Sequence, residues 1–323
     1  MRRNAEENHT KAKNRMNKQV TITVPATSAN LGPGFDCLGL ALGLYNRVTF
    51  TAVSSPTLTI EVTGLDVAKV PTDKTNVVYQ SACHMFDRLG ARPSGLHIQQ
   101  ENNIPVGSGL GSSSTAVLAG LLGANALMDG NFSQADILAI AAAEEGHPDN
   151  VAPALLGGLV LGVMDGEQVH IEQLPVAQQQ VIIVTPNFQL LTKDARAALP
   201  GQISRQDAIF NASRLPLLIR ALETAAYPKL TLAMQDRLHQ PHRLPLIPGM
   251  AAAFAAAHSA GAAGVALSGA GPSLIAFAPD HHAEIVSAVT AVFQQNNLTC
   301  RSWILPIDTA GTQINKLASQ DTI

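Results

Sequence analysis

The spacing of hydrophobic and polar residues predicts strands and helices mixed along the whole chain. Strict alternation, as in Leu58-Thr-Ile-Glu-Val62, is typical of a half-exposed strand, whereas apolar residues three or four apart are typical of a helix. Predicted strands cover 20–24, 48–52, 58–62, 96–100, 157–164 and 181–185, and 265–268 with 273–278 forms a predicted hairpin. Predicted helices cover 76–89, 116–127, 133–145, 204–222, 230–237, 250–260 and 283–294.

Two of the predicted helices have recognisable ends. The helix over 76–89 stops at Gly90, and glycine readily adopts the left-handed conformation that often ends a helix. Ser133 precedes the helix that runs to Glu145, and a serine hydroxyl at this place can accept a hydrogen bond from a free backbone N–H. These residues therefore mark the end of the first helix and the start of the second.

Strands and helices do not alternate regularly, which favours an α+β fold over a doubly wound parallel sheet. We expect two α+β halves, an N-terminal domain of residues 19–165 and a C-terminal domain of residues 166–323. Residues 1–18 are polar, mixed in charge and without the apolar core of a signal peptide. They are predicted to form a disordered extension, so that both Met1 and Met16 are candidates for the start of the chain.

Composition restricts the classes of partner. The net charge of −3 gives no general attraction to nucleic acid, and we expect no membrane-spanning segment because the longest alanine-rich stretch is interrupted by polar residues and glycine. Charged residues are sparse at 14%, which hints at a subunit contact. Cys37, Cys83 and Cys300 lie far apart without metal-ligand spacing, so we expect reduced thiols in a cytoplasmic protein and no catalytic role for Cys37.

A glycine-rich stretch, Pro105-Val-Gly-Ser-Gly-Leu-Gly-Ser-Ser-Ser-Thr115, runs directly into an apolar predicted helix. Glycines let backbone N–H groups crowd around an anion, and a helix N-terminus adds partial positive charge. The stretch predicts a phosphate-binding loop for a nucleotide; a loop that only caps the helix is the alternative. It is not a Walker A loop, because no lysine follows the glycines and the nearest are Lys74 and Lys193, and its glycine spacing does not fit a Rossmann fold. The candidate ATP-binding residues are Pro105, Val106, Gly107, Ser108, Gly109, Leu110, Gly111, Ser112, Ser113, Ser114 and Thr115.

Three segments, in this order, resemble the signature segments of the GHMP small-molecule kinases. They are 25–42 (PATSANLGPGFDCLGLAL), the glycine-rich loop, and 267–277 (LSGAGPSLIAF). A fourth segment, 145–153 (EGHPDNVAP), narrows the resemblance to the homoserine kinases of that superfamily. The resemblance covers nearly the whole chain from about Val20. It implies a nucleotide-binding N-terminal half like domain 2 of ribosomal protein S5 and a ferredoxin-like C-terminal half, with the active site between them.

The same resemblance implies that ATP phosphorylates the side-chain hydroxyl of L-homoserine, giving O-phospho-L-homoserine and ADP in threonine biosynthesis. It places Asp36 against the substrate ammonium, with Asn30 orienting it. Arg196 and Arg243 correspond to arginines that hold the substrate carboxylate, a role that suits the planar guanidinium fork. The resemblance also implies a homodimer and Mg²⁺ as the metal.

Two residues are carried over as magnesium ligands, Ser113 of the loop and Glu145 just before the fourth segment. Glu144 is the rival of Glu145, because the connection is short and the correspondence can slip by one residue. Magnesium prefers hard oxygen ligands, which a hydroxyl and a carboxylate supply.

Asn150 is expected to contact the reacting hydroxyl, and Thr192 the same hydroxyl or the γ-phosphate. We expect that no side-chain base is needed, because phosphoryl transfer through a loose transition state depends mainly on positioning and charge neutralisation. Asp149 is the alternative base, and His147 is interpreted as structural.

Two other interpretations stay open at this point. The chain could be another GHMP kinase, such as a mevalonate-type enzyme, or a non-catalytic sensor of a nucleotide or an amino acid. Asp36 together with the two arginines favours a substrate with both an amine and a carboxylate. The intact loop serines and the available glutamate argue against a sensor that has lost its metal.

Overall fold

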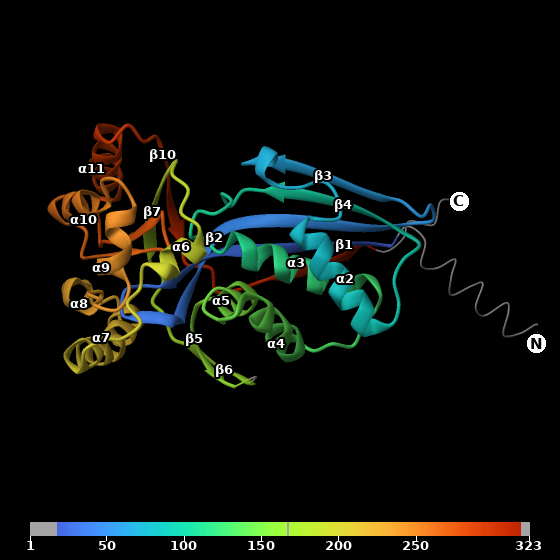
Figure 1. Cartoon of the computed structure of the whole chain (residues 1–323), viewed down its shortest axis with the longest axis horizontal. Helices are drawn as coiled ribbons and strands as arrows, with labels where there is room; N and C mark the ends of the chain where they lie inside the picture. Colours follow the sequence, from blue (N-terminus) through green and yellow to red (C-terminus); the bar gives the residue numbers. More distant parts are fainter. Residues whose placement is uncertain (1–17, 167, 318–323) are drawn as a thin grey trace, which may run out of the picture.

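A computed structural model of the chain describes residues 18–166 and 168–317. The predicted extension, residues 1–18, therefore lies outside the described residues apart from Lys18. Two sheets follow one another along the long axis of the molecule, the N-terminal sheet at the right of Figure 1 and the C-terminal sheet at its left. The predicted α+β class is confirmed. None of the described helices combines the length and the hydropathy that crossing a bilayer requires.

Within the described residues the N-terminal sheet has the order β11-β1-β2-β4-β3, and β5 pairs with β2 and with β6. Its strands are β1 (Gln19–Asn30), β2 (Gly34–Val53), β3 (Leu58–Gly64), β4 (Gly95–Asn102), β5 (Leu159–Asp165), β6 (Gln168–Leu174) and β11 (Gln313–Leu317). The helical elements of this half are η1 (Val67–Lys69), α2 (Val77–Leu89), α3 (Ser112–Leu127), α4 (Gln134–Glu145) and α5 (Val151–Leu156). Helix α3 packs on β1 and β2, and α2 packs on α3.

The C-terminal sheet has the order β10-β7-β9-β8, and each of its pairs is antiparallel. Numbered along the chain this order is fourth, first, third, second, so the predicted ferredoxin-like half is confirmed. Its strands are β7 (Gln180–Pro186), β8 (Gly264–Leu267), β9 (Leu274–Phe277) and β10 (Cys300–Pro306). Its helical elements are α6 (Thr192–Ala197), α7 (Arg205–Glu223), α8 (Tyr227–Ala233), α9 (Gln240–Arg243), η2 (Leu244–Leu246), α10 (Met250–Ser259) and α11 (His282–Gln295).

The predicted helix ends are confirmed at Gly90, which caps α2 in the left-handed conformation, and at Ser133, which accepts from the Asp136 backbone N–H in a capping box. The pattern missed the elements α5, β6, α6, α9, β10 and β11. The first predicted strand, 20–24, is too short, because β1 continues to Asn30 through a bulge after Pro25. The first signature segment, 25–42, is therefore part of the β-hairpin formed by β1 and β2.

The sheets do not divide the chain at residue 165. Strand β6 follows the predicted boundary but pairs with β5, and β11, near the end of the chain, pairs with β1. Both strands complete the N-terminal sheet, so the chain returns to its first half after it has built the second. Hydrophobic spacing does not reveal this return, because β11 is short and mostly polar.

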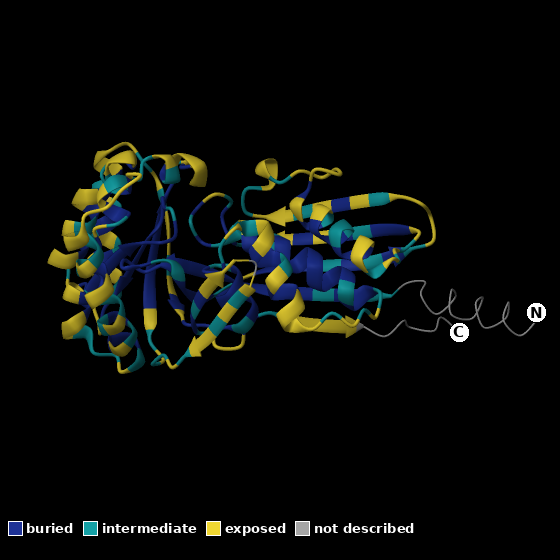
Figure 2. Cartoon of the chain, turned by 60° about the horizontal axis from the view of Figure 1, so that its bottom comes forward, coloured by how far each residue is buried: buried dark blue, intermediate teal, exposed yellow. Residues whose placement is uncertain are grey.

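The hairpin β1–β2 contributes to the cores of both halves. Phe50 of β2 packs beneath the N-terminal helices, whereas Leu38 and Leu40 of the same strand pack with Ile183 of the C-terminal sheet. The neighbouring Ile182 faces the opposite side, where α10 and α11 lie. Buried residues run along the strands of both halves in Figure 2. A shared core thus holds the halves together and fixes the walls of any site between them.

Gly120 lies in α3 where α2 crosses it. A Cβ at this position would come within 2.4 Å of the Val78 carbonyl oxygen and 2.7 Å of the Ser81 Cβ. The two helices can therefore lie this close only with glycine at position 120.

We predict that Gly120→Ala lowers the free energy of unfolding by about 1–3 kcal/mol, because overpacking a dense core costs this much. This loss of stability is expected although alanine is favoured over glycine inside a helix by about 1 kcal/mol. Urea unfolding measures the effect. Gly201→Ala is the control, since nothing lies within 4 Å of a Cβ built there. A midpoint for Gly120→Ala at or above that of the unchanged chain would contradict the prediction.

Candidate active site

A cavity of about 560 Å³ opens between the two halves. Its wall combines the glycine-rich loop and the first turn of α3 with the end of α4 and the turn that leads to α5. The C-terminal half contributes α6, α9 and the turn 269–271 between β8 and β9. Segments that are far apart in the sequence thus meet around one space.

The glycine-rich loop has the backbone that an anion-binding loop requires. Gly107, Gly109 and Gly111 have backbone φ angles of 68°, 81° and 70°, which residues other than glycine rarely adopt. Gly111 is the N-cap of α3, so the N-terminus of a 16-residue helix opens into the cavity. Of the candidate ATP-binding residues, Pro105 and Leu110 do not line the cavity. The others do.

Three segments that the sequence singled out are joined by main-chain hydrogen bonds. Thr27 N–H donates to the Leu110 carbonyl, and Gly269 N–H donates to the Ala29 carbonyl. A Cβ at Gly109 would lie 2.3 Å from the Ser268 carbonyl oxygen, so only glycine allows the loop this close to the C-terminal hairpin.

Glu145 faces the glycine-rich loop. Its two carboxylate oxygens accept hydrogen bonds from the hydroxyls of Ser113 at 2.7 Å and Ser114 at 2.8 Å. Glu144 points elsewhere, because its carboxylate contacts Ser81 and His84 of α2. The carboxylate and hydroxyl oxygens around Glu145 are the hard donors that suit magnesium, so this geometry favours Glu145 over Glu144.

Asp36 and Arg196 form a two-pronged ion pair in the cavity wall. The two guanidinium nitrogens of Arg196 lie 2.8 and 2.9 Å from the two carboxylate oxygens of Asp36, and this pairing raises the pKa of Arg196. Asn30 fixes the turn: its Oδ1 accepts from the Asp36 N–H at 2.9 Å and its Nδ2 donates to the Gly269 carbonyl at 2.8 Å. Asn30 therefore orients Asp36 through the backbone.

Arg243 also lines the cavity, yet only 2% of its surface is exposed. It donates to the carbonyl oxygens of Ala195 and Gly269 and contacts Nδ1 of His239, each at 3.3 Å. Burial lowers the pKa of Arg243, with the charge of Arg196 acting in the same direction. An arginine pKa starts so far above neutrality that the side chain stays cationic.

Asn150 lies between the loop and the acidic groups. Its Oδ1 accepts from the hydroxyl of Thr27 at 2.8 Å, and its Nδ2 lies 3.3 Å from the buried Asp149 carboxylate. That carboxylate is also paired with His147, and ligand atoms of Asp36, His147 and Asp149 lie within 4.8 Å of one another. The sequence spacing of these three residues gave no sign that they would meet.

Two residues near the site were missed by sequence reasoning. Thr27 fixes Asn150, and Phe35 lies beneath both arginines, with its ring centroid 5.8 Å from Cζ of Arg196 and 5.1 Å from Cζ of Arg243. Both belong to the first signature segment, which was the available signal. Thr192, at the first position of α6, lines the cavity as expected.

The end of the cavity away from the arginines is lined by apolar side chains together with Lys69, Gln100 and Asn102. Val70 and Pro71 follow η1, Val77 begins α2, and Val48 lies on β2. The buried Asn76 also lines this end and accepts hydrogen bonds from the Tyr79 N–H and from Gln100. The apolar side chains at this end suit the face of a flat ring system, and the polar ones can hydrogen-bond to its edge.

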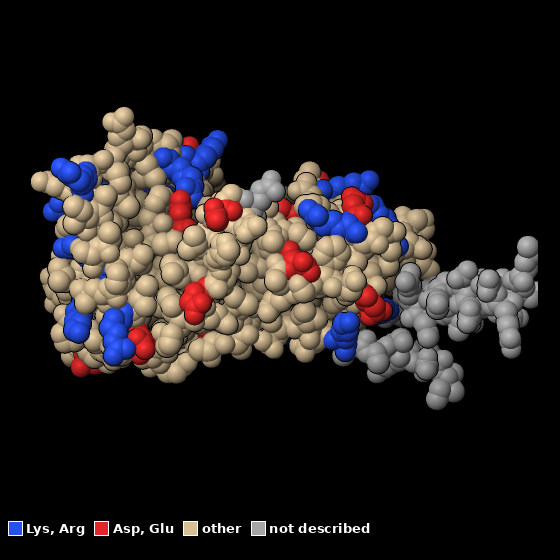
Figure 3. Space-filling view, turned by 90° about the horizontal axis from the view of Figure 1, so that it is seen from below, with Lys and Arg blue, Asp and Glu red and all other residues tan. Residues whose placement is uncertain are grey.

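Cys37 borders the site but carries a thiol with a raised pKa. Burial raises the pKa of the Cys37 thiol to about 11, with the charges of Asp149 and Asp36 acting in the same direction. A thiol of this kind is a poor nucleophile at neutral pH. On the face shown in Figure 3, basic and acidic side chains are interspersed over a mostly uncharged surface.

Comparison with known proteins identifies relatives of this arrangement. The family models for the GHMP kinases N-terminal domain and the GHMP kinases C-terminal domain match residues 76–158 and 218–295. The chain is 45% identical to a homoserine kinase of Nostoc punctiforme over 296 residues, which is 91% of this chain and 97% of that protein. A crystal structure of homoserine kinase from Cytophaga hutchinsonii superimposes with a TM-score of 0.82 at 30% identity, covering 92% of this chain and 97% of the other. The mevalonate kinase of L. major, at 16% identity, a TM-score of 0.66 and coverage of 91% and 96%, shares the fold.

We predict that the charge of His147 depends on Asp149. The hydrogen bond to Asp149 raises the pKa of His147 above its ordinary value, although burial acts in the opposite direction. In the Asp149→Asn variant the opposing effect of burial dominates, so the pKa should fall and His147 should lose its proton at a lower pH. Titration of the imidazole ¹H–¹³C NMR signals measures this shift. Glu144→Gln, which touches a different histidine, is the control, and an unchanged titration of His147 in Asp149→Asn would contradict the prediction.

Proposed function

The chain belongs to the homoserine kinases of the GHMP kinase family, and from this we propose that it transfers the γ-phosphoryl group of ATP to the side-chain hydroxyl of L-homoserine. The products are O-phospho-L-homoserine and ADP, a step of threonine biosynthesis. One observation of the structure carries the proposal: a glycine-rich anion-binding loop faces two arginines and two aspartates across one cavity. The loop suits a polyphosphate, and the charged wall suits an amino acid.

ATP is assigned to the N-terminal side of the cavity. The proposed phosphate contacts are the loop residues that line the cavity, from Val106 to Thr115 without Leu110. The adenine is assigned to the apolar end near Val70 and Val77. This assignment is supported by the N-terminus of α3, which opens toward the phosphate positions and favours negative charge there.

The proposed magnesium ligands are Ser113 and Glu145. They are supported by the 2.7 Å contact between the two side chains, which brings hydroxyl and carboxylate oxygens together beside the loop. Magnesium, when bound, neutralises charge on the β- and γ-phosphates. Glu145 holds its position through the second contact, to Ser114.

Homoserine is assigned to the charged wall on the C-terminal side. We propose that Asp36, oriented by Asn30, receives the ammonium group and that Arg196 and Arg243 receive the carboxylate. Because Arg196 is paired with Asp36, the zwitterion would insert between them, and each side chain would exchange its partner for the matching end of the substrate.

Transfer of the phosphoryl group is assigned to positioning. Asn150 and Thr192 are proposed to hold the substrate hydroxyl in line with the γ-phosphorus, and Thr27 fixes the amide of Asn150 by donating to its Oδ1. Asp149 is the alternative as a base. Its pairing with His147 already engages one of its oxygens, which supports a mechanism that relies on alignment and charge neutralisation.

The proposed setting is a homodimer in the cytoplasm that acts on a small molecule and contacts neither nucleic acid nor membrane. The three cysteines are free, as expected of thiols in a reducing compartment. The small share of charged residues leaves wide uncharged surface for a subunit contact.

We predict that, among homoserine, mevalonate and galactose, only L-homoserine stimulates release of ADP. Mevalonate has a carboxylate but no amine, and galactose has neither, so neither can satisfy both Asp36 and the arginines. A coupled assay of ADP release measures all three. Equal turnover with mevalonate would assign a different kinase activity, and nucleotide binding without turnover of any substrate would identify a sensor.

We predict that Glu145→Gln lowers turnover by roughly a hundredfold or more, because an uncharged amide would replace the carboxylate that is proposed to hold Mg²⁺ beside the phosphates. Glu144→Gln is the matched control and should stay within a few-fold of the unchanged enzyme, since Glu144 contacts α2 instead. Turnover against Mg²⁺ concentration, with calorimetric titration of ATP in the presence and absence of Mg²⁺, separates the two variants. The assignment is reversed if Glu144→Gln is the inactive one.

A further inference from the structure

Arg243 is held in the cavity wall by uncharged groups. Its Nε donates to the Ala195 carbonyl, and its Nη1 lies 3.3 Å from the Gly269 carbonyl oxygen and 3.3 Å from Nδ1 of His239. In the described part of the chain Nη2 has no hydrogen-bond partner, and no carboxylate lies within ion-pair distance of Arg243. Arg196, by contrast, has both terminal nitrogens engaged by Asp36.

His239 presents a lone pair to Arg243. The ring is fully buried, and its Nε2 lies 2.8 Å from the Gly32 carbonyl oxygen, which can only accept. Nε2 therefore carries the proton, and Nδ1 is the acceptor that faces the guanidinium group. Burial lowers the pKa of His239 and the charge of Arg243 acts in the same direction, while Asp236, whose carboxylate lies 3.5 Å from Nε2, acts against them. The guanidinium donor at Nδ1 leaves no place for a second ring proton, which favours the neutral imidazole.

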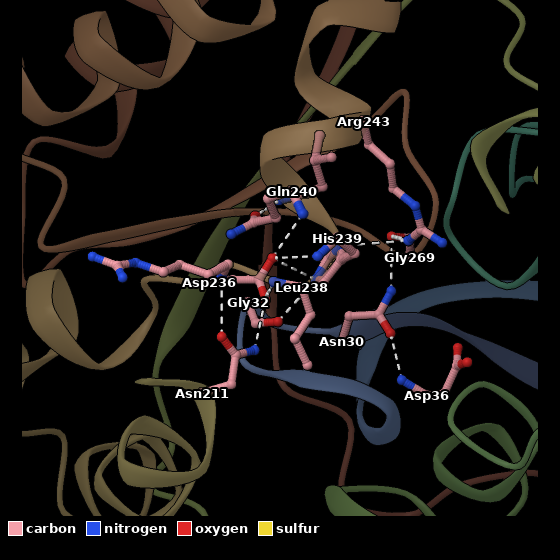
Figure 4. A network of polar contacts seen from close by, with 12 residues as sticks. Asn30, Gly32, Asp36, Asn211, Asp236, Leu238, His239, Gln240, Arg243 and Gly269 are labelled. Carbon is pink, nitrogen blue, oxygen red and sulfur yellow. Dashed lines mark hydrogen bonds and ion pairs between the residues drawn. The ribbon is translucent and has the colours of Figure 1, made fainter. Parts of the chain in front are cut away.

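The turn before α9 holds the backbone of His239 in place through hydrogen bonds to Asp236 (Figure 4). The buried Asp236 accepts hydrogen bonds from three backbone N–H groups, those of Leu238, His239 and Gln240, at 2.7–3.0 Å. The Nδ2 of Asn211 donates to the same carboxylate at 2.6 Å. These bonds hold the backbone on which His239 stands, while Gly32 holds the far end of its ring.

A second surface of the ring is also occupied. Phe35 stacks on His239 with ring centroids 5.0 Å apart and an angle of 19° between the planes. The same phenyl ring lies beneath the guanidinium of Arg243. The hairpin that carries Asp36 and Phe35 is thereby joined to α9, which carries Arg243.

We infer that His239 is a positioning residue for substrate binding, which uses its neutral Nδ1 to set the guanidinium plane of Arg243 and leave Nη2 for the carboxylate of the amino acid. The inference rests on the proposed function. A carboxylate at the same place would also accept from Arg243, but it would pair with the positive charge that the substrate needs. A neutral acceptor orients the arginine and leaves its charge available.

Two matched substitutions separate the two ends of the ring. His239→Asn keeps an acceptor near the Nδ1 position but cannot reach Gly32. His239→Gln keeps a donor near the Nε2 position but leaves Arg243 without its acceptor. We expect the KM for homoserine to rise roughly 5- to 20-fold in His239→Gln, because a hydrogen bond to a charged group is lost, and to stay within roughly 3-fold in His239→Asn. The KM for ATP should change little in either variant.

The reverse order, with His239→Gln normal and His239→Asn impaired, would overturn the inference, because the link to Gly32 would then be what matters. Equal losses in both variants with an unchanged KM for homoserine and a lower kcat would overturn it as well. His258→Phe is the control: this histidine also contacts a backbone carbonyl, that of Ala262, but lies outside the cavity wall. Thermal unfolding of every variant detects a loss of folding.

A double-mutant cycle tests whether His239 acts through Arg243. Arg243→Ala alone should raise the KM for homoserine, and adding His239→Gln to it should raise the KM no further, since no guanidinium is left to orient. If the two substitutions raise the KM for homoserine independently, so that their fold-changes multiply in the double variant, the inference is overturned. The unchanged enzyme would still phosphorylate homoserine in that case. An unchanged enzyme that does not phosphorylate homoserine would instead overturn the proposed function, so the two failures are distinguishable.

Discussion

The site depends on the close approach of three main-chain segments. The first hairpin, the glycine-rich loop and the turn between β8 and β9 touch through backbone groups, and at Gly109 there is no space for a side chain against the Ser268 carbonyl. Backbone contacts of this kind have few degrees of freedom, so they fix the distance between the phosphate loop and the C-terminal half. The core shared through β2 supports the same arrangement, because it leaves the halves little room to move apart.

This rigid frame carries two arginines in different electrostatic states. Arg196 is neutralised by Asp36, and its pKa is raised by that pairing. Arg243 is buried among carbonyls and a neutral imidazole, and burial lowers its pKa. Burial of an uncompensated charge costs free energy, and folded proteins retain such groups mainly where a ligand supplies the opposite charge. The contrast marks Arg243 as the group with an unsatisfied requirement for a carboxylate.

Much of the fold follows from local pattern. Helices with strong spacing and clear caps, such as the one begun by Asn76, could be predicted because each signal is contained within a few residues. Short elements such as α6 and α9 could not, since they are set by tertiary packing rather than by their own periodicity. The return of β11 to the first sheet is a pairing across nearly the whole chain, and no local pattern encodes a partner at such a separation.

The candidate site divides in the same way. The glycine-rich loop and the signature segments could be predicted from the sequence, because closely spaced glycines and serines are typical of an anion-binding loop. The choice between Glu144 and Glu145 depended on which way two adjacent side chains point at the end of α4, which spacing cannot supply. Asp36 lies more than a hundred positions from His147 and Asp149 in the sequence, so spacing gives no sign that the three side chains meet. His239 lies behind the cavity wall, beside Arg243, and belongs to none of the signature segments.

The balance of charges around the cavity gives a physical reason why the site would select an amino acid as its substrate. Two aspartates, Asp36 and Asp149, and two arginines, Arg196 and Arg243, line the cavity, so their formal charges cancel. Asp36 pairs with Arg196 and Asp149 pairs with His147, which leaves Arg243 without a carboxylate partner among the described residues. A zwitterion adds one charge of each sign and can satisfy an aspartate and an arginine together. A hydroxy acid without an amine would engage an arginine and leave Asp36 without a matching positive charge. Selectivity in such a wall comes from the penalty on an incomplete set of charges as much as from attraction to the complete one.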